Sequence, residues 1–167
     1  MAALNPGRLG FLALGTDVML EWRLHAVAQV LSDSGADICA MPGARMPPGA
    51  VLPPGFPYTW MGPRSVSWGA VGVFARCELA QHLRPVPELS SDRVQWFEFW
   101  GGASVPGEAR GPCFVFCACY PAPGGDVATW SGIISSVSSV RARHPGTRVL
   151  ICGDGNVHLS YVLEHHP

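Results

Sequence analysis

The stretch TRVLICGDGNVHL at residues 147–159 decides how the chain is interpreted. Four consecutive apolar residues, Val149 to Cys152, predict a strand that is apolar on both faces and suits the centre of a sheet. Asp154 and Asn156 follow, two residues apart. Because side chains at i and i+2 of an extended chain point the same way, we expect both to emerge together at the carboxyl end of this strand. A carboxylate beside an amide can bind a hard cation or a phosphate oxygen, although the flanking glycines also fit a plain turn.

The composition bounds the class of protein. The chain has 167 residues, enough for one domain with a core, and 48% of them are hydrophobic against 14% charged. The net charge is −1, from 11 basic and 12 acidic residues. This balance argues against a protein that coats nucleic acid, because phosphate contacts normally require a basic surface. It leaves open an enzyme that binds a few phosphates.

No apolar run reaches the roughly 18 residues that a membrane helix needs. Residues 8–20 have only a weak likeness to a signal peptide, because Asp17 and then Glu21 interrupt the apolar run. The sequence therefore favours an intracellular protein of the cytoplasm or nucleus with no membrane partner. It indicates no particular protein partner.

Three of the six cysteines lie in CFVFCACY at residues 113–120. Cys113, Cys117 and Cys119 have the same parity, so on a strand they share one face. No CxxC pair is present, and no histidine has zinc-finger spacing. We expect buried strand thiols, because cysteine is often buried without a function. A thiol-based metal or redox site is the alternative, which a zinc assay would test.

The order of predicted elements indicates an α/β sandwich. Residues 8–15 read as a first strand and residues 36–41 as another, with a helix over 17–35 between them. The Pro- and Gly-rich residues 42–62 predict a long loop, and residues 69–79 and 94–101 predict neighbouring strands. A strand within 111–125, a helix over 126–146 and the strand of 147–154 complete the order. In the last helix Asp126 is a possible N-cap, and Val127, Trp130, Ile133, Ile134, Val137 and Val140 mark its apolar face.

Four segments in this order resemble a known family. They are ADICAMPGAR (36–45), WGAVGVFAR (68–76), FCACYPAPGG (116–125) and VLICGDGN (149–156). Together they resemble the DNase-I-like endonuclease/exonuclease/phosphatase superfamily, and most closely its non-LTR retroelement endonucleases. The resemblance implies a four-layer α/β sandwich, incomplete at the C-terminus, with residues 1–167 forming a single partial domain.

The resemblance also implies a phosphodiester hydrolase that uses Mg²⁺ or Mn²⁺ and acts on nucleic acid. By motif match Asp154 would orient and deprotonate the attacking water, Asn156 would hold that carboxylate or the phosphate, and Tyr120 would approach the scissile phosphate. Asp154 and Asp17 are the candidate metal ligands, although Asp17 also suits the N-cap of a helix.

Side chains outside these motifs complete the candidate set. His158 and Arg64 are candidate substrate-binding residues, and an exposed loop position is the plainer interpretation of His158. Trp60 and Trp68, in loop-like sequence near Arg64, are candidates for stacking on nucleic-acid bases.

Two departures from the family pattern predict weak or absent hydrolysis. Pro42 and Gly43 occupy the place of the family's Gln-Glu pair, whose glutamate binds the metal, and glycine has no side chain that could ligate. The family's later Asp-His stretch has no counterpart, since only eleven residues follow Asn156. A non-catalytic remnant or binding module derived from a retroelement endonuclease is therefore the alternative function.

Overall fold

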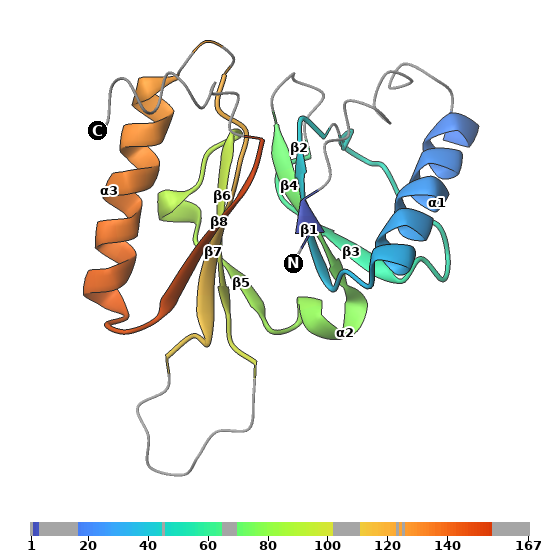
Figure 1. Cartoon of the computed structure of the whole chain (residues 1–167). Coiled ribbons are helices and arrows are strands. Elements are labelled where there is room, and N and C mark those ends of the chain that lie inside the picture. Colours follow the sequence, from blue (N-terminus) through green and yellow to red (C-terminus); the bar gives the residue numbers. More distant parts are fainter. Residues whose placement is uncertain are drawn as a thin grey trace.

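The computed structural model of the chain describes residues 2–3, 17–44, 46–64, 70–101, 111–122, 124 and 126–154, with the backbone alone described for 2–3 and 17–23. These residues form two four-stranded sheets, and Figure 1 shows them face to face with one long helix outside each. The layers are therefore helix, sheet, sheet and helix. The predicted α/β sandwich is confirmed.

The elements follow one another along the chain, with bounds as follows: β1 (Ala2–Ala3), α1 (Asp17–Ser34), β2 (Ile38–Pro42), β3 (Tyr58–Met61), β4 (Val71–Arg76), α2 (Cys77–Ala80), β5 (Leu83–Pro85), the short 3-10 helix η3 (Pro87–Leu89), β6 (Val94–Phe99), β7 (Phe114–Cys119), α3 (Val127–Arg143) and β8 (Arg148–Gly153). The strand expected at 8–15 lies outside the described residues.

Sheet A has the strand order β1-β2-β4-β3. β2 is parallel to β1 and antiparallel to β4, and β3 is also antiparallel to β4. The prediction of a continuous loop over 42–62 was wrong at β3. Tyr58 and Trp60 alternate with more exposed neighbours, so one face of this short strand is buried, and the Tyr58 hydroxyl donates to the Ala36 carbonyl at 3.0 Å. The density of Pro and Gly around β3 hid this alternation.

Sheet B has the order β5-β6-β7-β8. β6 is antiparallel to β5 and β7, whereas β7 and β8 are parallel and joined by α3. Two expectations were wrong here. β4 and β6 lie in different sheets rather than side by side, because the chain passes from sheet A to sheet B through α2 and β5. β8 lies at the edge of the sheet that the described residues form, not at its centre.

Three apolar clusters hold the layers together. Leu24, Val27 and Leu31 of α1 pack on one face of sheet A. Val71 and Val73 of sheet A meet Phe97 and Phe116 of sheet B between the sheets. The alternation of strand side chains gives each sheet two buried faces, and this arrangement produces the four layers.

The third cluster joins α3 to sheet B. Ile133 and Val140 pack on Trp96, Val115 and Cys117. Ile134 and Val127 remain exposed, so the apolar face predicted for this helix was too wide. Both residues are apolar, but they turn away from the sheet.

Local signals fix the helix ends as the sequence predicts. α1 ends at Ser34, and Gly35 follows with a φ of +64°, which suits glycine, while the Ala36 amide donates back to the Leu31 carbonyl at 3.1 Å. Asp126 caps α3, because its carboxylate accepts from the Thr129 amide at 3.0 Å.

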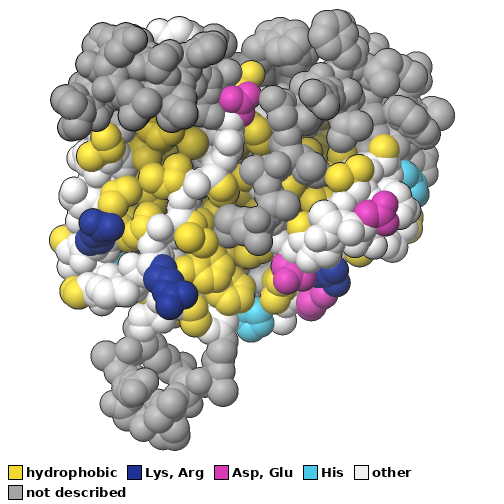
Figure 2. Space-filling view, viewed as in Figure 1, with side chains coloured by type: hydrophobic (Ala, Val, Ile, Leu, Met, Phe, Trp, Pro, Cys, Tyr) yellow, Lys and Arg dark blue, Asp and Glu magenta, His cyan; other side chains and the backbone are white. Residues whose placement is uncertain are grey.

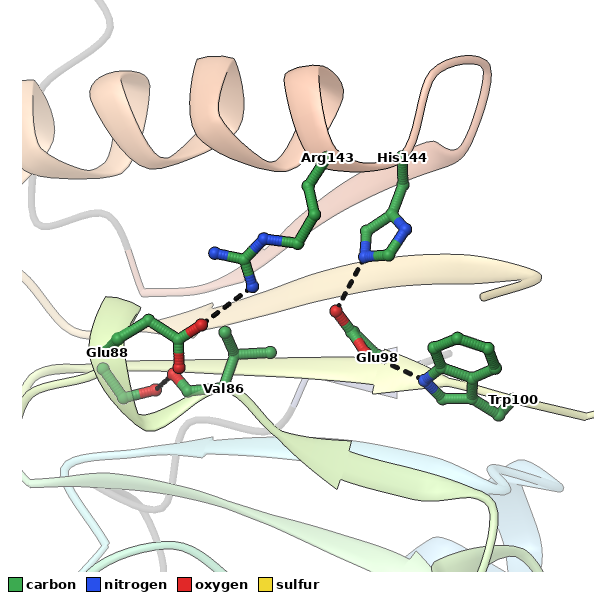
Figure 3. Close-up of polar contacts among 7 residues, drawn as sticks. Val86, Glu88, Glu98, Trp100, Arg143 and His144 are labelled. Atoms are coloured by element: carbon green, nitrogen blue, oxygen red, sulfur yellow. Dashed lines mark hydrogen bonds and ion pairs between the residues drawn. The ribbon is translucent and has the colours of Figure 1, made fainter. Parts of the chain in front are cut away.

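Polar contacts fasten the C-terminal end of α3 to sheet B (Figure 3). The Glu98 carboxylate accepts from Trp100 Nε1 at 2.9 Å and lies 2.9 Å from His144 Nε2, with the Glu98 and His144 side chains only 14% and 16% exposed. Arg143 Nη1 donates to Glu88 Oε1 at 2.8 Å. The helix that follows β7 is thus held at its far end before the chain enters β8.

Among the described residues, no helix is both long and apolar enough to cross a membrane.

Candidate functional site

The parallel pairing of β7 with β8 brings two of the predicted site residues to one edge. In the register of this pair Cys119 lies opposite Gly153, so Tyr120 and Asp154 are the next residues on adjacent strands. Neighbouring strands are about 4.8 Å apart. Both strands end at the upper edge of sheet B in Figure 1. We call this the Tyr120–Asp154 edge.

Sheet A contributes Gly43 to the same edge. Gly43 follows β2 with a φ of +70°, and a Cβ at this position would lie 3.5 Å from Tyr120 Cε1 and 3.8 Å from the Tyr120 hydroxyl oxygen. The position to which the family resemblance assigns the metal-binding glutamate therefore faces the tyrosine ring. Tyr120 packs against the cluster between the two sheets, which fixes its ring in place.

Arg93 is a cation at this edge that the sequence interpretation missed. It precedes β6, which runs antiparallel to β7 and so begins where β7 ends. The Tyr120 amide donates to the Arg93 carbonyl at 2.9 Å, and Arg93 Nη1 donates to the Tyr120 carbonyl at 3.3 Å. The signal available in the sequence was an arginine immediately before a strand, which is too common to single out.

Asp126 adds a negative charge close to this arginine. Its carboxylate accepts from the Thr129 hydroxyl at 2.6 Å and from the Ala122 amide at 3.3 Å. The Thr129 hydroxyl and then the backbone amides hold the pKa of Asp126 below its usual range, and the positive charge of Arg93 adds to this effect. Asp126 therefore stays ionised at neutral pH, and its role is to cap the N-terminus of α3.

The other predicted site residues are more scattered. Arg64 is exposed beyond the end of β3, where its guanidinium donates to the Ala50 carbonyl. β2 and β3 run in the same direction with β4 between them. Arg64 therefore lies at the same end of sheet A as Gly43, but about 10 Å away across the sheet, which is two strand spacings. Asp17 is the first residue of α1, where the structure describes the backbone alone. Asn156 and His158 lie outside the described residues.

Neither predicted tryptophan contact gains support. Trp60 is buried and its ring packs edge-on against Phe74, with 5.1 Å between centroids. Trp60 is therefore a core residue, contrary to the stacking hypothesis. Trp68 lies outside the described residues.

The thiols beside this edge are structural. Cys117 and Cys119 are buried under α3, as the parity argument predicts, while Cys113 precedes the strand and is exposed. The neighbouring Cys119 thiol and then burial raise the pKa of Cys117, and burial raises the pKa of Cys152 to about 12. These two thiols remain protonated at neutral pH and are poor metal ligands in that form.

The described residues do not fit a divalent-cation site. No group of three His, Cys, Asp or Glu side chains within them comes close enough to hold an ion. At the Tyr120–Asp154 edge the position facing Tyr120 is a glycine, and one carboxylate with neutral groups makes a weak Mg²⁺ site.

Comparison with known structures identifies the architecture. The endonuclease domain of TRAS1, a telomere-specific non-LTR retrotransposon, superposes with a TM-score of 0.57 at 12% identity. The match covers 95% of this chain and 59% of that one. The chain has the DNase-I-like fold.

A second DNase-I-like structure gives the same result. TDP2 of D. rerio, in a complex with single-strand DNA product, superposes with a TM-score of 0.52 at 10% identity, covering 98% of this chain and 62% of that one. This chain thus spans about three fifths of each of these two structures. No protein-family model matches the sequence, and no curated protein matches it.

Proposed function

We propose that the Tyr120–Asp154 edge is a phosphodiester hydrolase site of the DNase-I-like type in which hydrolysis is weak or absent. The substrate class is nucleic acid. The observation that carries this proposal is the meeting of Tyr120, Asp154 and position 43 at one edge, although they come from three strands in two sheets. These are three of the positions at which the family resemblance implies catalytic groups.

The chemistry of phosphodiester hydrolysis assigns a role to each group. The reaction needs an oriented water molecule, positive charge against the phosphate oxygens, and hydrogen-bond donors for the developing negative charge. Asp154 would orient the water, and the Tyr120 hydroxyl would donate to a phosphate oxygen. Arg93, bonded to the Tyr120 carbonyl, supplies a positive charge nearby. In this proposal Asn156 supports Asp154, and Arg64 and His158 contact the flanking phosphates.

The metal is the weak element of this site. The family resemblance implies Mg²⁺ or Mn²⁺, with Asp17 and Asp154 as the candidate ligands in this chain. Gly43 removes the carboxylate that the family supplies from the strand facing Tyr120. Without it, the charge that must neutralise the phosphate is not held in place, and we expect this loss to limit turnover.

Plasmid nicking in Mg²⁺ tests the impairment directly. We expect supercoiled plasmid to remain intact with the wild-type chain, or to be nicked only slowly. Rapid nicking that disappears in Asp154→Ala would show that the site is fully active, and it would overturn the proposed impairment.

Restoring the carboxylate tests whether this edge is the site. We expect Gly43→Glu to produce a Mg²⁺-dependent rise in the melting temperature, while Gly43→Gln, with the same size and the same backbone strain, produces none. The left-handed φ of +70° costs either side chain about 1 kcal/mol, so the two variants are matched in stability. Equal responses to Mg²⁺ would contradict the placement of the site.

A second candidate function is a binding module that holds nucleic acid without cleaving it. Gly43 favours it, because loss of the metal carboxylate leaves the Tyr120 hydroxyl and Arg93 able to contact a phosphate. Fluorescence anisotropy with labelled single-stranded DNA tests it in EDTA. We expect binding that weakens as salt is added. Arg93→Gln should lower the affinity and also reduce its salt dependence, because one contact between a cation and a phosphate is lost. Absence of binding at low salt would remove this function.

A further inference from the structure

The loop that joins β2 to β3 contains the same turn twice. Residues 46–57 read MPPGAV and then LPPGFP. In the first turn the Ala50 amide donates to the Pro47 carbonyl at 3.1 Å, and in the second the Phe56 amide donates to the Pro53 carbonyl at 3.0 Å. The glycine in the third position has a φ of +80° in the first turn and +76° in the second. Both are type II turns with proline as their second residue. We call residues 46–57 the Pro-Pro-Gly loop.

Contacts with sheet A and α1 hold this loop in one conformation. Leu52 and Phe56 pack against the cluster between α1 and sheet A, and the Phe56 ring lies 5.7 Å from the Phe74 ring between centroids. The Cys77 amide donates to the Pro57 carbonyl at 3.1 Å, which fastens the end of the loop. Figure 1 shows the loop passing beside α1 on its way to β3. Its two turns are therefore formed before any partner arrives.

The other side of the loop presents apolar side chains at every third residue. Pro48, Val51, Pro54 and Pro57 are exposed, and Val51 is 82% exposed. The loop contains no charged residue, and Figure 2 shows few charged side chains among the described residues on that face of the molecule. A partner of this loop must therefore recognise it by apolar contact and shape, because the loop has no charge to pair.

The backbone narrows the class of partner. Five of the twelve residues are prolines, which have no amide hydrogen, so the loop cannot pair as a strand with another sheet. The second residue of a type II turn has φ and ψ near −60° and +120°, close to polyproline II, and a residue before proline is restricted to the same region. Each Pro-Pro pair is thus a short polyproline II segment that ends at a glycine. Aromatic-lined grooves recognise this conformation.

We propose that the Pro-Pro-Gly loop is a docking site for a protein domain with an aromatic-lined, proline-recognising groove. Pro47–Pro48 and Pro53–Pro54 are its two equivalent ligands, and the exposed Val51 contacts the rim of the groove from between them. Because the turns are already formed, the loop loses little conformational entropy on binding. The proposal does not depend on the proposed function, since binding is measured without metal or nucleic acid.

Isothermal titration of the whole chain against purified SH3, WW and EVH1 domains, up to about 1 mM, tests this docking site. We expect at least one of these domains to bind. Pro48→Ala or Pro54→Ala alone should raise its dissociation constant about twofold, because one of two equivalent ligands is lost. The double variant should raise the constant at least tenfold, which is about 1.4 kcal/mol. Circular dichroism of each variant checks that the chain remains folded.

Pro145→Ala is the matched control. Pro145 is exposed and is also the second residue of a turn, in which the Thr147 amide donates to the His144 carbonyl at 3.2 Å and Gly146 has a φ of +82°. It follows a histidine and not a proline, so we expect Pro145→Ala to leave binding unchanged. If no domain binds the wild-type chain, the two turns only shape the loop and the proposal is overturned. Binding that survives the double variant, or that falls equally in Pro145→Ala, would overturn it as well.

Discussion

Gly72, in the middle of sheet A, is the position at which one methyl group tests the packing most sharply. A Cβ built on Gly72 would lie 2.2 Å from Trp60 Cζ2, 2.4 Å from Cη2 and 2.9 Å from Cε2. The indole cannot easily move aside, because it packs in a T-shaped arrangement with the Phe74 ring and its Nε1 donates to the Pro63 carbonyl at 3.4 Å. Gly72→Ala must therefore displace a buried aromatic ring.

The expected cost follows from two effects. Overpacking a well-filled core costs about 1–3 kcal/mol. Loss of the edge-to-face geometry between Trp60 and Phe74 adds about 0.5–1.5 kcal/mol. We expect Gly72→Ala to lower the free energy of unfolding by about 2–4 kcal/mol, which corresponds to a fall in melting temperature of roughly 5–15 °C for a domain of this size.

Thermal and urea unfolding followed by circular dichroism measure this change. Gly132→Ala, inside α3, is the matched control, because no atom lies within 4 Å of the Cβ it would add. Alanine is the better helix former, so this variant should be more stable by about 1 kcal/mol. Adding Trp60→Leu to Gly72→Ala should remove most of the clash, so the two substitutions will not be additive. Shifts of the same sign for Gly72→Ala and Gly132→Ala would refute the reasoning.

Three further predictions concern individual side chains. Glu98→Ala leaves Trp100 Nε1 and His144 without their acceptor, so it should lower the free energy of unfolding in urea by about 1–3 kcal/mol. Glu98→Gln keeps an acceptor for Trp100 and should lower it by less. The Thr129 hydrogen bond holds the pKa of Asp126 low, so the stability that this carboxylate contributes should be complete above about pH 4 and be lost as the pH falls through the lowered pKa. Asp126→Asn should therefore reduce the fall in melting temperature at acid pH. Brief alkylation at pH 7.5, read by mass spectrometry, should label the exposed Cys77 and Cys113 and spare Cys117 and Cys152. Equal labelling of all four would contradict the burial of Cys117 and the raised pKa of Cys152.

The sequence predicted those elements whose local pattern is strongest. β7, α3 and β8 each have an uninterrupted periodic run with a cap or turn at its ends, and Tyr120 and Asp154 could be placed because both immediately follow such strands. β3 could not be found, because four residues among prolines and glycines carry too little periodicity and are fixed by pairing with β4. Tertiary pairing, not local preference, makes that strand.

The position of β8 shows a different limit of sequence interpretation. Its apolar pattern predicts that both faces are covered, and within the described residues both Leu150 and Ile151 are exposed. A hydrophobic pattern records what a strand needs around it, but it does not say which neighbour provides the cover. Arg93 shows the same limit for the site, because its place beside Tyr120 follows from the antiparallel pairing of β6 with β7.

The geometry of the candidate site depends on two separate contacts, and they differ in strength. Tyr120 and Gly43 are held together by the buried cluster between the sheets, in which Phe97 and Phe116 stack with 5.1 Å between their centroids. Asp154 depends on β8, which the described residues hold through one parallel ladder and the packing of Val149 and Cys152. A strand paired on one side alone opens more readily than a central strand. Any strand that pairs with the outer side of β8 should therefore hold Asp154 more firmly in place beside Tyr120, so strand pairing and the chemistry of the site are coupled through the same six residues.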